Sequence, residues 1–186
     1  MLNCPEIASA CLPVPMGLAA SAPIGWTLQR AHQLFDAQHR RGLARRVWSM
    51  VSGRAARLDR LGAALAARPV RQCHALGVKT IPIRAICGSE NRCGDFDRWF
   101  APLTSVTRAR WQRLAAAKLN GEALPAIEVV QLGGCYFVRD GHHRVSVARA
   151  LGEEYIEADV TLWEVAAAST AAPSDQPDRA SLAVSA

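Results

Sequence analysis

Glycine residues divide the stretch from residue 127 to residue 162 into short segments, and this division constrains the fold more than any other feature of the chain. Residues 127–132 and 135–138 are apolar and rich in β-branched or aromatic side chains, which favours strands. Gly133-Gly134 separates them, and a glycine turn of this length between two strands is typical of a β-hairpin. We therefore expect two antiparallel strands joined by this turn.

A helix and a third strand are predicted after the hairpin. We expect the helix over about residues 142–151, because Gly152 is a typical residue just beyond a last helical turn. Residues 156–162 then alternate between apolar and polar side chains. Such alternation predicts a strand with one buried face.

Two more elements are predicted upstream of the hairpin. Residues 80–86 are a β-branched run that can form a strand if Pro82 lies at a sheet edge, since proline has no N–H to donate. Residues 104–119 predict a helix that ends at Asn120-Gly121. The order of strand, helix, hairpin, helix and strand predicts a compact α+β domain over residues 75–165.

The basic residues are concentrated ahead of this domain. The chain has 186 residues and a formal net charge of +6. Residues 26–74 carry ten arginines and two aspartates, whereas basic and acidic residues balance over residues 75–165. Apolar side chains recur at helical intervals in the basic block. It is therefore predicted to be an Arg-rich helical region with a break at Gly53 and an end at Pro69.

Two interpretations of the basic block are open. Arg40, Arg41, Arg45 and Arg46 could neutralise the phosphates of DNA, and such binding would weaken steeply as the salt concentration rises. Alternatively, an amphipathic helix pair packs on the domain and leaves its arginines in water. A membrane surface is not an expected partner, because the apolar face has few large side chains. A run of about 18 apolar residues, which a transmembrane helix needs, is not present in the sequence.

The ends of the chain and its cysteines indicate a cytoplasmic protein. Residues 1–25 have no positively charged start and contain several prolines, so we expect a flexible extension rather than a secretory signal. Residues 166–186 are rich in Ala, Ser and Pro and are predicted to be a disordered tail. The six cysteines form no Cys-x-x-Cys pair. We expect them to be reduced and to serve as small apolar residues.

Residues 136–146 carry the chemistry. An apolar strand runs directly into Asp140-Gly141, and a helix is predicted to start at once, so its first N–H groups have no intrahelical partner. His142, His143 and Arg144 lie in this first turn, although the helix dipole repels cations there. An anion would relieve this repulsion, because phosphate oxygens could accept hydrogen bonds from the N–H groups and from the three side chains. The pattern therefore predicts a phosphate site.

Two other interpretations of this segment compete with a phosphate site. Asp140 could simply cap the helix while both histidines stay neutral and solvated. A metal site formed by the protein alone is not expected, because His142 and His143 point in directions about 100° apart on a helix. Mg²⁺ held by Asp140 through a bound nucleotide is favoured over such a site.

Residues 79–163 resemble the ParB N-terminal/sulfiredoxin superfamily. The matching segments are residues 81–86, 124–127, 136–138, 140–144, 148–152 and 156–160. The resemblance implies a small mixed sheet with packed helices, in which the turn at residues 140–144 surrounds nucleotide phosphates. It leaves open whether the nucleotide is ATP, ADP or CTP, and it allows for Mg²⁺.

Members of this superfamily use the turn differently. Partition proteins bind CTP through Gly-Glu-Arg-Arg, sulfiredoxin has Gly-Cys-His-Arg with a nucleophilic Cys, and an ADP-dependent free-serine kinase is more similar to the present Asp-Gly-His-His-Arg. Aligning Gly141 and Arg144 puts His142 at the place of the sulfiredoxin Cys, so sulfiredoxin activity is not expected. Only a strand and a tail follow Leu151, so the DNA-reading helix-turn-helix of a full partition protein is not expected either.

Two functions are therefore predicted as alternatives. The first is a ParB-like module that binds a nucleotide or another phosphorylated ligand through Gly141, His142, His143, Arg144 and Arg92. The second is a small-molecule kinase or phosphotransferase that uses the same phosphate contacts. Its catalytic residues would be Glu90 or Asp140 as base, together with His142. The kinase relative implies an acid in the loop of Glu90, although a solvated loop acid is an equal alternative there. Nuclease activity ranks last, because the sequence has no acidic cluster for two metal ions.

Overall fold

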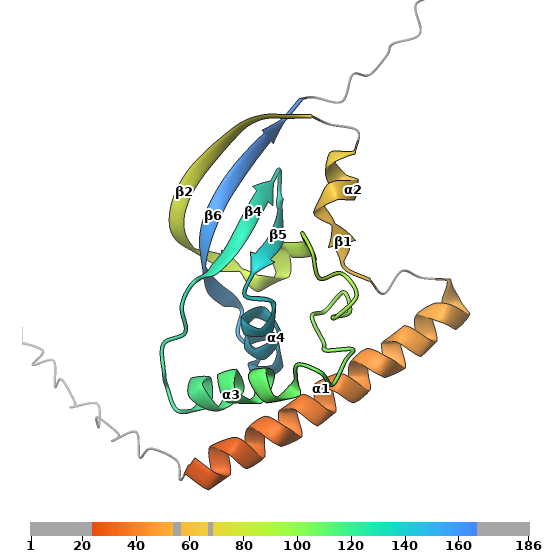
Figure 1. Ribbon diagram of the computed structural model, residues 1–186, viewed down its shortest axis with the longest axis vertical. Helices are drawn as coiled ribbons and strands as arrows, with labels where there is room; N and C mark the ends of the chain where they lie inside the picture. The colour runs from red at the N-terminus through yellow and green to blue at the C-terminus, as the bar shows by residue number, and fades with distance from the viewer. Residues whose placement is uncertain (1–23, 54–56, 67–68, 167–186) are drawn as a thin grey trace, which may run out of the picture.

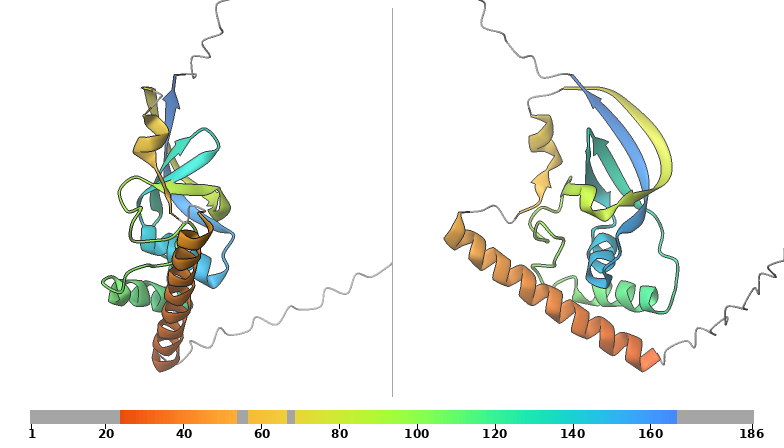
Figure 2. Two further views of the ribbon diagram at one scale, coloured as in Figure 1. Left: turned by 90° about the vertical axis from the view of Figure 1, so that its right-hand side faces the viewer. Right: turned by 180° about the vertical axis from the view of Figure 1, so that it is seen from behind.

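The computed structural model describes residues 24–53, 57–66 and 69–166 of the protein. They form a six-stranded mixed sheet, and the helices Ile24–Ser52, Arg108–Leu119 and His142–Leu151 lie beyond one end of its strands (Figures 1 and 2). The order across the sheet is β1-β3-β5-β4-β6-β2. The α+β class predicted from the sequence is therefore confirmed.

The elements have the following bounds. The strands are β1 (Asp59–Arg60), β2 (Val70–Pro82), β3 (Ile86–Ser89), β4 (Ile127–Leu132), β5 (Cys135–Asp140) and β6 (Tyr155–Val165). The helices are α1 (Ile24–Ser52), α2 (Leu61–Leu65), the 3₁₀ helix η1 (Ile83–Ala85), α3 (Arg108–Leu119) and α4 (His142–Leu151). Two neighbouring pairs are antiparallel: β4 with β5, and β2 with β6. The other neighbouring pairs, β1 with β3, β3 with β5 and β4 with β6, are parallel.

The glycine-divided part of the chain folds as predicted. β4 and β5 form the expected hairpin, with Leu132 paired with Cys135 across the turn. α4 covers the residues predicted for it, and Gly152 follows it in the left-handed conformation. Pro82 ends β2, which is an edge strand of the sheet, so the expected edge position is also confirmed.

The main core lies between the sheet and α4. Its buried side chains include Ile127, Val129, Val138 and Val160 from the strands and Val145 and Ala148 from α4. Burying one such Val or Ile side chain contributes about 1.5–3 kcal/mol. The core therefore fixes α4, and the turn that precedes it, against the ends of β4 and β5.

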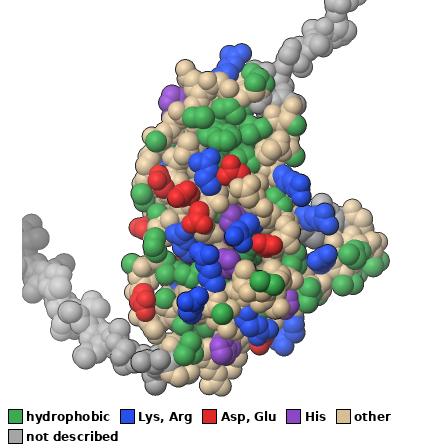
Figure 3. Space-filling view, in the orientation of Figure 1, with side chains coloured by type: hydrophobic (Ala, Val, Ile, Leu, Met, Phe, Trp, Pro, Cys, Tyr) green, Lys and Arg blue, Asp and Glu red, His purple; other side chains and the backbone are tan. Residues whose placement is uncertain are grey.

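Helix α1 packs on the domain along its first part and its middle, as far as Arg45. Phe35 is fully buried and meets Trp111 of α3 edge-on, with ring centroids 5.5 Å apart. Asp36 and Arg108 form an ion pair at 2.8 Å. The last part of the helix instead exposes apolar side chains: Val47, Trp48, Met50 and Val51. Figure 3 shows hydrophobic side chains at this projecting end of α1.

The structure differs from the prediction between α1 and β3. Gly53 ends α1 as expected, but residues 57–66 contain β1 and the five-residue α2 in place of a second long helix. β1 pairs with β3, and Leu58 and Leu61 are buried in separate clusters. These tertiary contacts override the helical spacing of the apolar residues. The single strand predicted over residues 80–86 is in fact the end of β2, η1 and the start of β3.

The predicted extension and tail lie almost wholly outside the described residues, whereas four of the six cysteines lie within them. Apart from residues 24, 25 and 166, the predicted extension and tail lie outside the described residues, as do Cys4 and Cys11. Cys87 and Cys135 form a disulfide, which corrects the expectation of reduced cysteines for this pair, whereas Cys73 and Cys93 are free. The spacing along the chain could not reveal this pair, because pairing of β3 with β5 brings it together. None of the helices in the described ranges has the length and hydropathy to cross a bilayer.

Candidate functional site

The candidate site is the turn between β5 and α4. Gly141 has φ +94°, and a Cβ built on it would lie 2.5 Å from Cγ2 of Ile127, so both the conformation and the packing require glycine. The first intrahelical bond of α4 runs from the Val145 N–H to the Gly141 carbonyl. The N–H groups of the residues between them are the unpaired donors expected at a helix start. The predicted start of the helix is therefore confirmed.

His142 points into the protein and is held by β3. Its Nε2 forms a 2.6 Å hydrogen bond with the Oγ of Ser89, a fully buried residue that also accepts the Arg92 N–H at 2.9 Å. The imidazole stacks on Phe96. His142 is therefore fixed by the end of β3 and does not extend into solvent. Ser89 was not among the residues predicted from the sequence, because it lies 53 residues away along the chain.

His143 is also buried but lacks a comparable partner. Only 6% of the residue is exposed, and its ring meets Phe96 edge-on at 5.4 Å. Among the described residues, its Nε2 is one of the few buried side-chain polar atoms without a hydrogen bond. A group that can donate to or accept from this nitrogen is therefore needed to satisfy it.

Both histidines are uncharged near neutral pH. Burial lowers the pKa of His142 to about 4, and the positive charge of Arg92 adds to this effect. Burial likewise lowers the pKa of His143 to about 4, with Arg110 as the strongest charged contributor. The sequence placed cationic side chains in this turn, but its two imidazoles are neutral and the remaining charge belongs to Arg144.

Arg144 is held by the protein itself. Its Nη1 donates to the carbonyl oxygens of Pro125 and Ala126 at 2.7 and 2.6 Å, and its Nη2 donates to Oδ2 of Asp140 at 2.5 Å. Asp140 therefore neutralises Arg144 and does not cap the helix, whose N-cap Gly141 has no side-chain hydrogen bond. Most of the guanidinium N–H groups that were expected to donate to a phosphate are therefore already bonded to the protein.

These residues surround a hollow of about 260 Å³. Its lining is formed by Arg92, Arg110, Leu114, Pro125, Asp140, Gly141, His142, His143 and Arg144. The structure thus brings together the whole predicted 140–144 turn and Arg92. Arg110 of α3 is an addition, and no local pattern in the predicted helix distinguished it from its neighbours. Over α3 and α4, Figure 3 shows basic, acidic and histidine side chains close together on one face.

The remaining predicted residues lie away from the hollow. Glu90 is not part of its lining and pairs with Arg139 at 3.0 Å. On α1, Arg45 pairs with the buried Asp97 at 3.2 Å and lies over the Trp99 ring, so it docks the helix. Arg40, Arg41 and Arg46 are exposed on the same helix, and DNA binding through them stays a prediction. The described part of the chain contains no group of three or more His, Cys, Asp or Glu side chains placed to hold a metal ion.

Comparisons with known proteins add one structural similarity. No protein-family model and no curated protein matches the chain. Among solved structures, the chain is similar to sulfiredoxin from Arabidopsis thaliana, with a TM-score of 0.35 and 18% identity over 45% of this chain and 82% of that one. A similarity of this size carries no argument about activity. The α+β class follows from the strands and helices themselves.

Proposed function

We propose that the protein binds a phosphate-bearing small molecule in the hollow at the start of α4. The observation that carries this proposal is His143, a buried residue of the lining whose Nε2 has no hydrogen-bond partner. An unpaired buried polar group costs about 1–3 kcal/mol, so it persists where a ligand can satisfy it. In the tautomer with a proton on Nε2, this imidazole donates to a phosphate oxygen.

The charges around the hollow support an anion. Arg92 and Arg110 are exposed at its edge, while the charge of Arg144 is compensated by Asp140. The first N–H groups of α4 add the positive end of the helix dipole. Arg92 already pairs with Asp95 at 3.2 Å, so its guanidinium would exchange or share that partner on binding.

The size of the hollow supports a phosphate or pyrophosphate group. Its volume of about 260 Å³ lies below the roughly 300–1,000 Å³ typical of pockets that enclose whole ligands. The rest of a larger ligand would lie outside. ATP, ADP and CTP, the nucleotides implied by the superfamily resemblance, therefore remain the candidates to test.

The proposal is tested by calorimetric titration with pyrophosphate and with each nucleotide, with and without Mg²⁺. We expect saturable binding that weakens about tenfold or more in Arg110→Ala, since a hydrogen bond to a charged group is worth about 1.5–3 kcal/mol. Arg113→Ala is the matched control, because Arg113 is exposed on the same helix and does not line the hollow. Absence of saturable binding, or equal losses in both variants, would refute the proposal.

Phosphoryl transfer is the second candidate, and Asp140 favours it. Its side chain lines the hollow and is 58% exposed, so it could orient a substrate hydroxyl or hold Mg²⁺ of a bound nucleotide. Glu90 has no such position. Incubation with ATP or ADP, Mg²⁺ and a pool of hydroxylated metabolites would give a phosphorylated product. Saturable nucleotide binding without turnover would leave binding as the function.

A further inference from the structure

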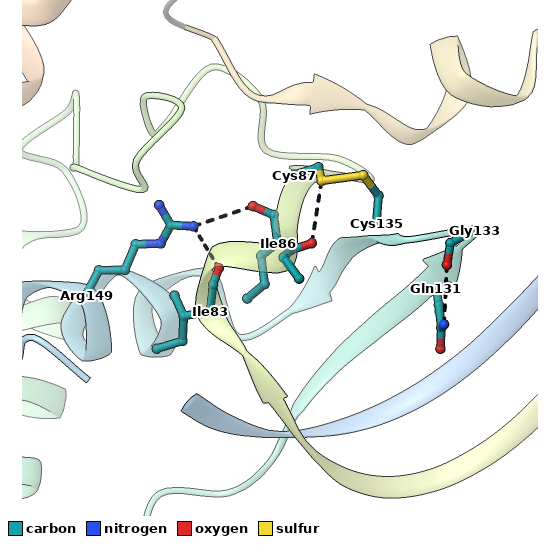
Figure 4. Close-up of a disulfide and its surroundings, with 8 residues drawn as sticks. Ile83, Ile86, Cys87, Gln131, Gly133, Cys135 and Arg149 are labelled. Atoms are coloured by element: carbon teal, nitrogen blue, oxygen red, sulfur yellow. Dashed lines mark hydrogen bonds between the residues drawn. A yellow bond between two sulfur atoms is a disulfide. The ribbon is translucent and has the colours of Figure 1, made fainter. Parts of the chain in front are cut away.

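Cys87 and Cys135 join two neighbouring strands of the sheet. Cys87 lies in β3 and Cys135 begins β5, with their Cα atoms 5.7 Å apart across 48 residues of sequence (Figure 4). Both residues are half-buried and not sealed in the core. A disulfide that solvent can reach exchanges with external thiols. We propose that this pair is a reversible thiol–disulfide site that reacts with small-molecule thiols and disulfides such as glutathione.

The surroundings of Cys87 accommodate both redox states. Its sulfur lies 3.5 Å from the Ala85 carbonyl oxygen, which is a ready acceptor for the thiol of the reduced form. The pairing of β3 with β5 also shifts in register between Ile86 and Gly88, so Cys87 lies at an irregular point of the ladder. At such a point a residue is not held by a regular ladder pair.

We assign the first exchange step to Cys135, because it follows the exposed turn of Gly133 and Gly134. In oxidation, the Cys135 thiolate attacks one sulfur of oxidised glutathione, which forms a mixed disulfide and releases one glutathione thiolate. The Cys87 thiolate then attacks the Cys135 sulfur, which forms the protein disulfide and releases the second glutathione thiolate. Overall, the two protein thiols give two electrons and two protons to glutathione disulfide, which becomes two molecules of reduced glutathione.

The disulfide lies between two attachments of the η1–β3 segment to α4. Ahead of Cys87, Nη2 of Arg149 donates to the carbonyl oxygens of Ile83 and Ile86 at 2.9 and 3.4 Å, as Figure 4 shows. Beyond Cys87, Ser89 holds His142. A change in the bond at Cys87 therefore acts on the short strand that positions the Ser89 hydroxyl.

Tight packing carries such a change along β3. The backbone of Gly88, between Cys87 and Ser89, lies so close to Phe137 that an added Cβ would be 2.7 Å from its Cδ1. The strand has no slack at this point, so displacement of Cys87 moves Ser89 as well. The oxidised form holds the hydrogen bond between Ser89 and His142, and reduction loosens it.

The redox step is tested on the full chain by equilibration in glutathione buffers of graded ratio. After alkylation, peptide mass mapping should show Cys87 and Cys135 losing their thiols together in one transition, while far-UV circular dichroism stays unchanged. Cys73→Ser is the matched control, because Cys73 is exposed and free, and this variant should keep the transition. Independent alkylation of the two thiols at every ratio, or loss of structure on reduction, would overturn the proposal.

The coupling to α4 is tested by NMR without any phosphate ligand. We expect the ring C–H resonances of His142 to differ between the oxidised and the reduced protein. Cys135→Ser should give the reduced spectrum at every glutathione ratio, which separates the redox state from the chemistry of the buffer. Identical His142 resonances in the two states would show that the disulfide does not act on the site. Neither measurement depends on the phosphate proposal.

Discussion

At the scale of single residues, His143 has an unpaired buried nitrogen that costs stability and that a bound ligand would satisfy. We expect His143→Phe to keep the edge-on contact with Phe96 and to remove the unpaired nitrogen. The free energy of unfolding should then stay the same or rise by about 1 kcal/mol, while pyrophosphate affinity falls. Urea unfolding and calorimetric titration measure the two effects.

The matching change at His142 should behave differently. His142→Phe removes the hydrogen bond from the buried Ser89, so it should lower the free energy of unfolding by about 1–3 kcal/mol. If His143→Phe were destabilising to the same degree and left affinity intact, His143 would be a structural residue.

The lowered histidine pKa values also predict how stability depends on pH. The unfolded chain protonates His142 near its usual pKa of 6.5, and the folded chain does so near 4. Protonation therefore favours the unfolded state. The stability that neutral, buried His142 gives the folded state is fully present above the unfolded pKa, and it is lost as the pH falls toward 4. From about pH 7 to about pH 4.5, we expect a loss of about 2 kcal/mol from His142. Urea unfolding at both pH values measures it, and His142→Asn should show a smaller loss; an equal loss would assign the effect to other groups.

Individual site residues were predictable only where local sequence positions them. Gly141 and the start of α4 follow from the strand, the glycine and the apolar period around them. Ser89 and Arg110 come from distant segments, and one sequence does not show which side chains a fold brings together. The pairing of Arg144 with Asp140 was missed for a different reason, because Arg144 was assigned to a phosphate and Asp140 to a helix cap, a base or Mg²⁺.

At the scale of elements, the same contrast separates α4 from the segment before β2. The β4–β5 hairpin and α4 are set by glycines at their ends, so their bounds were predictable. Leu58 and Leu61 have helical spacing with their neighbours. They nevertheless directly precede and follow β1 in the sequence, and each is buried in a different hydrophobic cluster. A periodic pattern does not show that its apolar residues meet one surface.

The attachment of α1 can be tested at a single buried ring. Phe35 is 0% exposed and packs on Trp111, so Phe35→Ala should lower the free energy of unfolding by about 3–5 kcal/mol in urea. Val47→Ala on the same helix is the control, because Val47 is 62% exposed, and it should change stability by about 0.5 kcal/mol or less. Similar small effects in both variants would mean that α1 is not docked on α3 in solution.

At the scale of the whole molecule, the sheet crosses the boundary that composition suggested. The predicted domain began at residue 75, but β2 starts at Val70 and β1 pairs with β3 from within the basic block. Charged side chains lie mostly at the surface. Their positions along the chain therefore do not show which segments pair as strands of the sheet. The arginines of this block therefore belong partly to the fold, as the ion pair of Arg45 with Asp97 illustrates.

The two proposals meet in β3 and α4, and together they predict a thermodynamic linkage. If the disulfide fixes Ser89 and His142, it preorganises the hollow, so the oxidised protein should bind pyrophosphate about fivefold or more tightly than the reduced one. Linkage then requires saturating pyrophosphate to shift the glutathione equilibrium toward the disulfide by the same factor. Calorimetry of both forms and a redox titration with and without pyrophosphate measure the two factors independently. Equal pyrophosphate affinities of the two forms would show that the disulfide does not influence the phosphate site. If the affinity ratio and the shift of the glutathione equilibrium were unequal, a simple two-state linkage would not describe the protein.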